Sequence, residues 1–302
     1  MTSFTKKKIE VTLQLQNNTT FDTGGNTLHL SGYRVECEAR NIGMMGSGST
    51  AKVKIYGMSL NDMNKMTVTQ WQNLTVSKNL ITVMAGDDSN MSMAFDGEIT
   101  QAWSDLSGTP DTCLTIDANL AFSQQVTPAE GTATQAQTPV ADMMKDLATK
   151  MGYGFENNGV DGTLSAMTLK GSYIDQAKTV ASASNILWTI ENKVLIIAPM
   201  GQPIRKGQIP LLNEQTGLLG YPSISSKGVS IVCLYNPAIN FYDLIKIETP
   251  IKPAEGEWIV SSLSYRLESE KANGAWYCQI EAIRPQNAVG EANNTGGDDV
   301  EQ

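Results

Sequence analysis

Leu80-Ile81-Thr82-Val83-Met84-Ala85-Gly86 begins a stretch of sequence whose pattern returns at Leu244-Ile245-Lys246-Ile247-Glu248-Thr249. In both places a turn and a second apolar run follow, from Phe95 to Ile99 and from Gly256 to Val260. After a polar loop, the third runs end in Ile116-Asp117-Ala118 and Ile280-Glu281-Ala282. Each third run also contains one cysteine, but the two cysteines are out of step by one residue. Short runs of this kind between turns are typical of β-strands. The sequence therefore predicts one module of three strands, present twice, over residues 80–118 and 244–282.

The residues around the first copy also have the pattern of strands. Apolar and polar residues alternate over Ile9-Val11-Leu13-Leu15 and Val35-Cys37-Ala39, with glycine-rich turns between such runs. Strict alternation indicates sheets with one buried face, and many short strands favour a barrel or a sandwich. We therefore expect residues 1–125 to form a first β-barrel domain, with a short helix at 61–66.

An α+β insert separates the two β regions. Residues 126–137 are predicted to be a linker, followed by a small domain over 138–200. Its first helix is expected to have Thr138 as N-cap and Pro139 at the first helical position, and to end at Gly152. Ser172-x-x-Asp175 predicts the capping box of a second helix, and residues 186–197 predict a β-hairpin. The first helix carries an apolar stripe on one face: Val140, Met143, Met144, Leu147, Ala148 and Met151.

The remainder of the chain is expected to be a second, similar β-barrel domain over 201–286. Residues 287–302 are polar and acidic, and we expect them to be disordered in isolation. The predicted fold class is thus mainly β with an α+β insert.

Composition limits the function. The formal net charge of −9 argues against a protein that grips nucleic acid by its phosphates, although an acidic surface would let DNA pass without sticking. No window has the roughly 18 apolar residues that a spanning helix needs, and the lysines at 6–8 are not followed by the apolar run of a signal peptide. We therefore predict no stable membrane insertion and assembly in a cytoplasm.

The search for reactive residues finds no site. Cys37, Cys113, Cys233 and Cys278 are far apart in strand-like runs, and His29 is the single histidine. This composition does not suit a zinc site or a Cys-His nucleophile, so we expect buried free thiols and a solvent-facing histidine.

Three weaker candidates have simpler explanations. The glycine-rich run Gly43–Thr50 lacks the Gly-Lys-Ser/Thr of a phosphate loop. Asp87 and Asp88 could serve glycoside hydrolysis, but they lie in a turn. Trp103, Trp188, Trp258 and Trp276 are scattered, which does not indicate a sugar-binding platform. We predict that the chain is not an enzyme and has no catalytic residue, cofactor or metal ligand.

The order of these motifs resembles the baseplate or tail hub proteins of contractile-tailed bacteriophages, including the late control protein D relatives. The resemblance covers roughly residues 5–285. The residues that carry it lie in both β regions and in the insert: Val53–Ser59, Ile81–Gly86, Phe95–Ile99, Leu169–Ser172, Ile186–Trp188, Leu195–Pro199, Gly217–Pro222, Cys233–Pro237, Gly256–Val260 and Trp276.

The resemblance implies a structural role in the virion. Two similar barrels per chain, repeated in a homotrimer, would make a ring of pseudo-sixfold symmetry. Such a ring would join a sixfold tail tube protein to a threefold central spike protein and line the DNA channel without binding DNA specifically. Other baseplate or tape-measure components would be further partners.

Two alternatives stay open at this point. One is a β-rich tail protein that binds or degrades carbohydrate, through Asp87, Asp88 and exposed tryptophans. The other is a component of a related host secretion apparatus with the same fold and mechanics.

Overall fold

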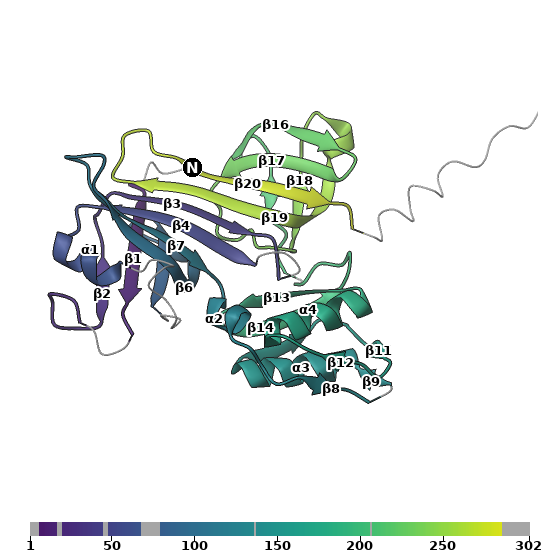
Figure 1. The fold of residues 1–302 in the computed structure, drawn as a ribbon. Coiled ribbons are helices and arrows are strands. Elements are labelled where there is room, and N and C mark those ends of the chain that lie inside the picture. The colour runs from purple at the N-terminus through teal and green to yellow at the C-terminus, as the bar shows by residue number, and fades with distance from the viewer. Residues whose placement is uncertain are drawn as a thin grey trace, which may run out of the picture.

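The computed structural model describes residues 6–16, 20–44, 48–67, 79–135, 137–205 and 207–285. The structure is mostly β, which confirms the predicted main class. Figure 1 shows a first group of strands in purple and blue, a mixed α/β part in teal, and a second group of strands in green and yellow. The predicted disordered tail, 287–302, lies outside the described residues.

The first β unit is an antiparallel sheet in the order β3-β4-β7-β6-β5-β1-β2. The alternation seen in the sequence places Ile9, Val11 and Leu13 in the core, each with at most 1% of its surface exposed. The predicted short helix is present, and its N-cap Ser59 accepts a hydrogen bond from the Asp62 amide. The elements are β1 (Lys8–Gln14), β2 (Thr27–Leu30), β3 (Val35–Asn41), β4 (Ser49–Tyr56), α1 (Leu60–Met66), β5 (Leu80–Gly86), β6 (Met91–Asp105) and β7 (Cys113–Asn119).

The second β unit has the strand order β16-β17-β20-β19-β18, with β15 parallel to β18 at its edge. Its core contains Ile231, Ile245 and Ile280, all at most 2% exposed. The elements are β15 (Leu211–Leu212), β16 (Leu218–Ser225), β17 (Gly228–Leu234), β18 (Leu244–Ile247), the 3-10 turn η2 (Lys252–Ala254), β19 (Gly256–Ser269) and β20 (Trp276–Ile283).

The two units share one continuous sheet because β19 has partners from both. Its N-terminal end pairs with β18, and its C-terminal half pairs with β3, from Leu263 opposite Asn41 to Ser269 opposite Val35. Leu267 of β19 is thereby fully buried in the core of the first unit.

The expected barrels are not closed among the described residues. The paired strands run from β16 to β2 as an open sheet and form no ring of hydrogen bonds. The first unit nevertheless curls until β1 approaches the end of β19, where Lys6 Nζ lies 2.5 Å from Glu270. At the junction between the units, β19 extends the sheet from one unit into the other, and the free ends of the path are β16 and β2.

The insert packs two helices against the sheet β10-β14-β13 (Figure 1). The methionine stripe of its first helix is core, as Met144 is fully buried and Met143 and Met151 are 5% exposed. The elements are α2 (Phe122–Val126), β8 (Thr132–Ala133), β9 (Thr138–Pro139), α3 (Val140–Met151), β10 (Gly154–Asn157), β11 (Thr163–Leu164), β12 (Thr168–Leu169), α4 (Tyr173–Ser184), β13 (Ile186–Glu191) and β14 (Val194–Pro199).

The helix caps of the insert are partly as predicted. The capping box of α4 is confirmed, with both reciprocal bonds between Ser172 and Asp175. Gly152, at a φ of 76°, ends α3 as expected. The N-cap of α3 was predicted one residue too early: Pro139 occupies it, because its backbone is still non-helical at a ψ of 133° and the helix begins at Val140.

The predicted linker 126–137 contains structure of its own. Thr132 and Ala133 form β8, which pairs with Leu169 and Thr168 of β12. Two residues are too few to produce a visible alternation, so this strand has no signature of its own in the sequence.

An ion cluster fastens the insert to the second unit. Arg205 Nη1 lies 3.0 Å from both carboxylate oxygens of Asp243, and Arg205 Nη2 contacts Glu191 at the end of β13. All three side chains are one third exposed or less. Burial raises the pKa of the Glu191 carboxyl, although the neighbouring guanidinium pulls that pKa down.

Candidate functional site: the repeated units and their shared polar face

The two β units match strand by strand. The order β3-β4-β7-β6-β5 of the first is the order β16-β17-β20-β19-β18 of the second, and every neighbouring pair is antiparallel. Leu80 pairs with Glu98 as Leu244 pairs with Ile259, which is the alignment that the sequence predicted. The sequence repeat therefore corresponds to a repeat of structure that includes two further strands on each side.

A β-bulge lies at the same position in both units. In β6 the register against β7 shifts between Ile99 and Gln101, which leaves Thr100 as the extra residue. In β19 the register against β20 shifts between Val260 and Ser262, which leaves Ser261. A bulge bends and twists its strand locally, so the two long strands curve at equivalent points.

The hydrogen bonds around the bulges also correspond. Thr100 Oγ1 donates to the Asp117 carbonyl over 3.0 Å, and Ser261 Oγ donates to the Glu281 carbonyl over 3.1 Å. The amide of Ile99 donates to the Asn79 carbonyl, and the amide of Val260 donates to the Asp243 carbonyl. Chance likeness of two meanders would not reproduce these local bonds, and we infer that the two units are copies.

The cysteines of the third strands are not equivalent. Asp117 and Glu281 occupy equivalent positions, because each pairs with the residue that directly follows the extra residue of the bulge. Counting from them, the counterpart of Cys278 is Leu114, and the counterpart of Cys113 is Tyr277. The offset seen in the sequence is therefore real, and the Ile-acid-Ala ending is the part that the copies share.

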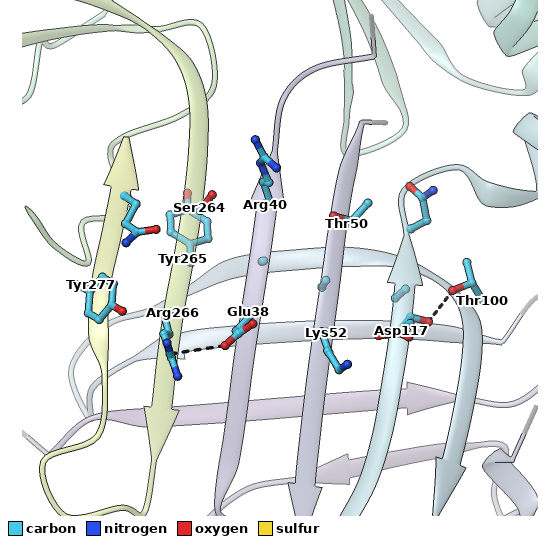
Figure 2. Close-up of a pocket in the computed structure, with 15 residues that line it drawn as sticks. Glu38, Arg40, Thr50, Lys52, Thr100, Asp117, Ser264, Tyr265, Arg266 and Tyr277 are labelled. Atoms are coloured by element: carbon cyan, nitrogen blue, oxygen red, sulfur yellow. Dashed lines mark hydrogen bonds and ion pairs between the residues drawn. The ribbon is translucent and has the colours of Figure 1, made fainter. Parts of the chain in front are cut away.

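A shallow hollow of about 540 Å³ lies on the outer face of the joined sheet, across β20, β19, β3, β4 and β7 (Figure 2). Its charged lining residues are of both signs and come from both units: Glu38, Arg40, Lys52, Asp117 and Arg266. Because alternate residues of each strand point away from the core, the exposed half of each alternation builds this face. We call it the polar face.

Opposite charges lie next to one another across the polar face. Arg266 Nε is 3.5 Å from Glu38 Oε1, and Lys52 stands between Glu38 and Asp117 in the strand register. Lys52 Nζ also lies 5.8 Å from the centre of the Trp103 ring. The compensation is partial, because three of the five charged lining residues are basic and Arg40 lies between Ser264 and Thr50 in the strand register.

Candidate reactive residues are not gathered into a site. His29 is exposed on β2 as predicted, and its Nδ1 lies 3.0 Å from Thr12 Oγ1. Asp87 accepts the amides of Ser89 and Asn90 in its turn, and Asp88 forms an ion pair with Lys8. Within the described part of the chain, no three His, Cys, Asp or Glu side chains are placed to hold a metal ion.

The other sequence candidates are also accounted for. Trp188 and Trp258 are buried, and Trp103 and Trp276 are half-buried in different strands, so these four do not make an exposed platform. Residues 45–47 of the glycine-rich run lie outside the described residues.

All four cysteines are free and buried, as predicted. Burial raises the pKa of the Cys37 thiol to about 12, which keeps it protonated and unreactive at neutral pH. Cys233 and Cys278 face each other across β17 and β20, and the Cys233 sulfur raises the pKa of the Cys278 thiol far above its ordinary value.

In the part of the chain that the structure describes, no helix combines the length and the apolar character needed to cross a bilayer.

Three solved structures of tail proteins have a similar fold. The 43 kDa tail protein of prophage MuSo2 from Shewanella oneidensis matches with a TM-score of 0.61 and 10% identity, over 91% of this chain and 97% of the other. A tail protein from Neisseria meningitidis MC58 matches with a TM-score of 0.61 and 8% identity, over 91% and 96%. The prophage tail protein gp18 from Listeria monocytogenes EGD-e matches with a TM-score of 0.50 and 6% identity, over 95% and 98%. At these identities the likeness establishes the fold.

The family follows from the sequence itself. The model of the family described as "Baseplate hub gp41" matches residues 9–281, so the chain belongs to this family. No curated protein sequence matches the chain significantly. Membership makes the chain a structural component of a phage tail baseplate and confirms the resemblance to tail hub proteins.

Proposed function

We propose that the chain forms a homotrimeric ring of pseudo-sixfold symmetry, which joins the tail tube to the central spike and surrounds the DNA channel. The observation that carries this proposal is the pairing of β3 with β19, because it joins two copies of one five-stranded unit edge to edge in a single chain. Three chains would supply six such units. A sixfold tube and a threefold spike can then both bind the same ring in register.

The division of labour along the chain is part of the proposal. Residues 1–125 and 201–286 would be the two ring-forming domains, and residues 138–200 would stand outside the ring. In Figure 1 the insert lies to one side of the joined sheet, a position in which it could contact other baseplate or tape-measure components. The ion cluster at Arg205 would hold it in a fixed orientation to the ring.

The polar face is the surface that we assign to the bore. It is continuous across both units, and Arg266 and Lys52 lie beside the carboxylates of Glu38 and Asp117, whereas Arg40 has hydroxyl residues on both sides in the register. Specific and non-specific DNA binding both depend on uncompensated positive charge against phosphates. A bore in which most basic groups have a carboxylate beside them would bind phosphates weakly and let DNA slide through, without the excess of acidic groups that the net charge of the chain suggested.

Light scattering on the purified chain tests the proposal. The expected result is a stable particle of three times the 32.7 kDa monomer mass, with no release of sugar from cell-wall material. A monomer at all concentrations would contradict the ring. A monomer that also releases reducing sugar would favour the carbohydrate-degrading alternative instead. Assembly in the bacterial cytoplasm belongs to the same proposal and predicts trimers in the soluble lysate.

A further inference from the structure

One edge of the joined sheet exposes apolar side chains. β16 is the terminal strand, and among the described residues no strand pairs with its outer side. Along it Leu219 is 43% exposed, Tyr221 is 76% exposed and Ile224 is 46% exposed. An open edge strand of this composition is a template for pairing with another chain.

The internal repeat shows what is missing at this edge. The counterpart of β16 is β3, and the counterpart of Ile224 is Ala39, since the two residues pair with Val229 and Ala51 at equivalent positions. Ala39 is 4% exposed, because β19 continues the sheet beyond it and places Tyr265 opposite. Ile224 is on the same side of the sheet as the buried Val229, yet it is half exposed because no strand follows.

In the described residues of the first unit, β6 has a matching flank that no strand pairs with, although helix α1 also packs against β6. β5 pairs with β6 only from Met91 to Glu98, and the described residues place no strand on that flank of the C-terminal half of β6. The equivalent flank of β19 is the one that β3 occupies. Counting from the bulges, Leu106 is the counterpart of Leu267. Leu267 is fully buried at the junction, and Leu106 is 48% exposed.

We propose that β16 of one copy pairs with the C-terminal half of β6 of a second copy, in the register that β3 makes with β19. This register places Ile224 opposite Ser104 and Ser223 opposite Asp105. The occupant is another copy of this chain, because β3 and β19, the counterparts of β16 and β6, already make this pairing within each chain. The inference rests on the proposed ring and specifies its interface between chains.

The two surfaces are different patches, so the contact is head to tail and can close into a ring. Substituting either patch with arginine should therefore prevent closure. We expect Ile224→Arg and Leu106→Arg each to reduce the particle from the trimer mass to the monomer mass, a threefold fall. Val126→Arg is the matched control, since Val126 is also an exposed apolar residue, at 44%, but lies at the end of α2, outside β16 and the C-terminal half of β6. It should stay trimeric.

Mixing the two variants separates this contact from other interfaces. Leu106→Arg keeps an intact β16, and Ile224→Arg keeps an intact β6, so one contact can still form. The mixture should give particles of twice the monomer mass. Contact of β16 with β16 would instead let Leu106→Arg associate with itself, which would overturn the inference.

A disulfide tests the register directly. With Ile224→Cys and Ser104→Cys in one chain, oxidation should give covalent trimers on a non-reducing gel. With Ile224→Cys and Gln101→Cys it should not, because three residues along a strand exceed the reach of a disulfide. If trimers form but neither arginine variant disrupts them, the inference is wrong and the ring stands. If the unmodified chain is monomeric, the proposed function has failed.

Discussion

Arg205 makes a sharp test of the electrostatics, because it stands between two carboxylates. Replacing it in Arg205→Met leaves Glu191 and Asp243 facing each other without a cation, at 25% and 15% exposure. Breaking a fully buried pair costs about 3–5 kcal/mol, and an exposed pair is worth about 0–1 kcal/mol. Glu191 and Asp243 are buried to an intermediate degree, so we expect Arg205→Met to lower the free energy of unfolding by about 2 kcal/mol. If the free energy of unfolding decreases by about 3 kcal/mol per M of urea, the midpoint of urea unfolding should fall by about 0.7 M.

The stability deficit of Arg205→Met should depend on pH, and the pKa of Glu191 sets the direction of that dependence. Burial already holds the pKa of Glu191 above its ordinary value, and removal of the guanidinium raises it further. A carboxyl with a raised pKa in the folded state binds its proton more tightly there than in the unfolded state. Its contribution to folding is therefore present at low pH and is lost as pH rises through the folded pKa. The deficit of Arg205→Met should be largest near pH 7 and should shrink towards pH 4.

Urea titration of both proteins at pH 7.5 and pH 4.5 measures this difference. Arg266→Met is the control, since Arg266 and Glu38 form an ion pair while 52% and 60% exposed, and we expect a change of at most about 0.5 kcal/mol. A deficit for Arg205→Met that stays constant or grows on acidification would refute the reasoning.

Three further outcomes follow from single sites. Gly228→Ala should be strongly destabilising, because Gly228 has a φ of 140° and an added Cβ would lie 2.0 Å from the backbone oxygen of Ala282 in β20. The melting temperature should fall strongly. Gly162→Ala, which has open space around the added Cβ, should melt within a few degrees of the parent. All four thiols should resist a thiol reagent in the folded protein at pH 8 and react in urea; fast labelling of Cys37 in the native state would contradict its pKa of about 12. Ser172→Ala should cost about 1 kcal/mol through loss of the α4 capping box, and an unchanged chemical denaturation curve would show that the cap contributes nothing.

Much of the fold could be predicted from local patterns. Period-two alternation placed Val11 and Leu13 in the core, and the Ser172-x-x-Asp175 spacing located the start of α4. The repeat at Leu80 and Leu244 aligned two strand pairs in their true register. These features succeed because strand alternation and helix caps depend on residues close together in the chain.

The features that were missed depend on contacts far apart in the sequence. The pairing of β3 with β19 joins Ala39 to Tyr265, and neither residue carries a local sign of its partner. Without that pairing, two separate barrels were the natural expectation. The two-residue strand β8 was invisible for a related reason, since its pairing with β12 and not its own pattern defines it.

The polar face could not be assembled from sequence either. Glu38, Lys52, Asp117 and Arg266 are ordinary exposed charges in the sequence, and they become neighbours only through sheet order. The more informative feature of the sequence was the repeated strand pattern at Leu80 and Leu244. Family membership then gave that repetition a structural setting in the baseplate.

In the proposed assembly, two copies of one unit in each of three chains build a six-unit ring. Electron microscopy of the purified chain tests it most directly. End-on class averages should show six similar lobes around an open centre, with three additional densities for the inserts. Particles with three lobes, or chains that remain single at high concentration, would contradict the account.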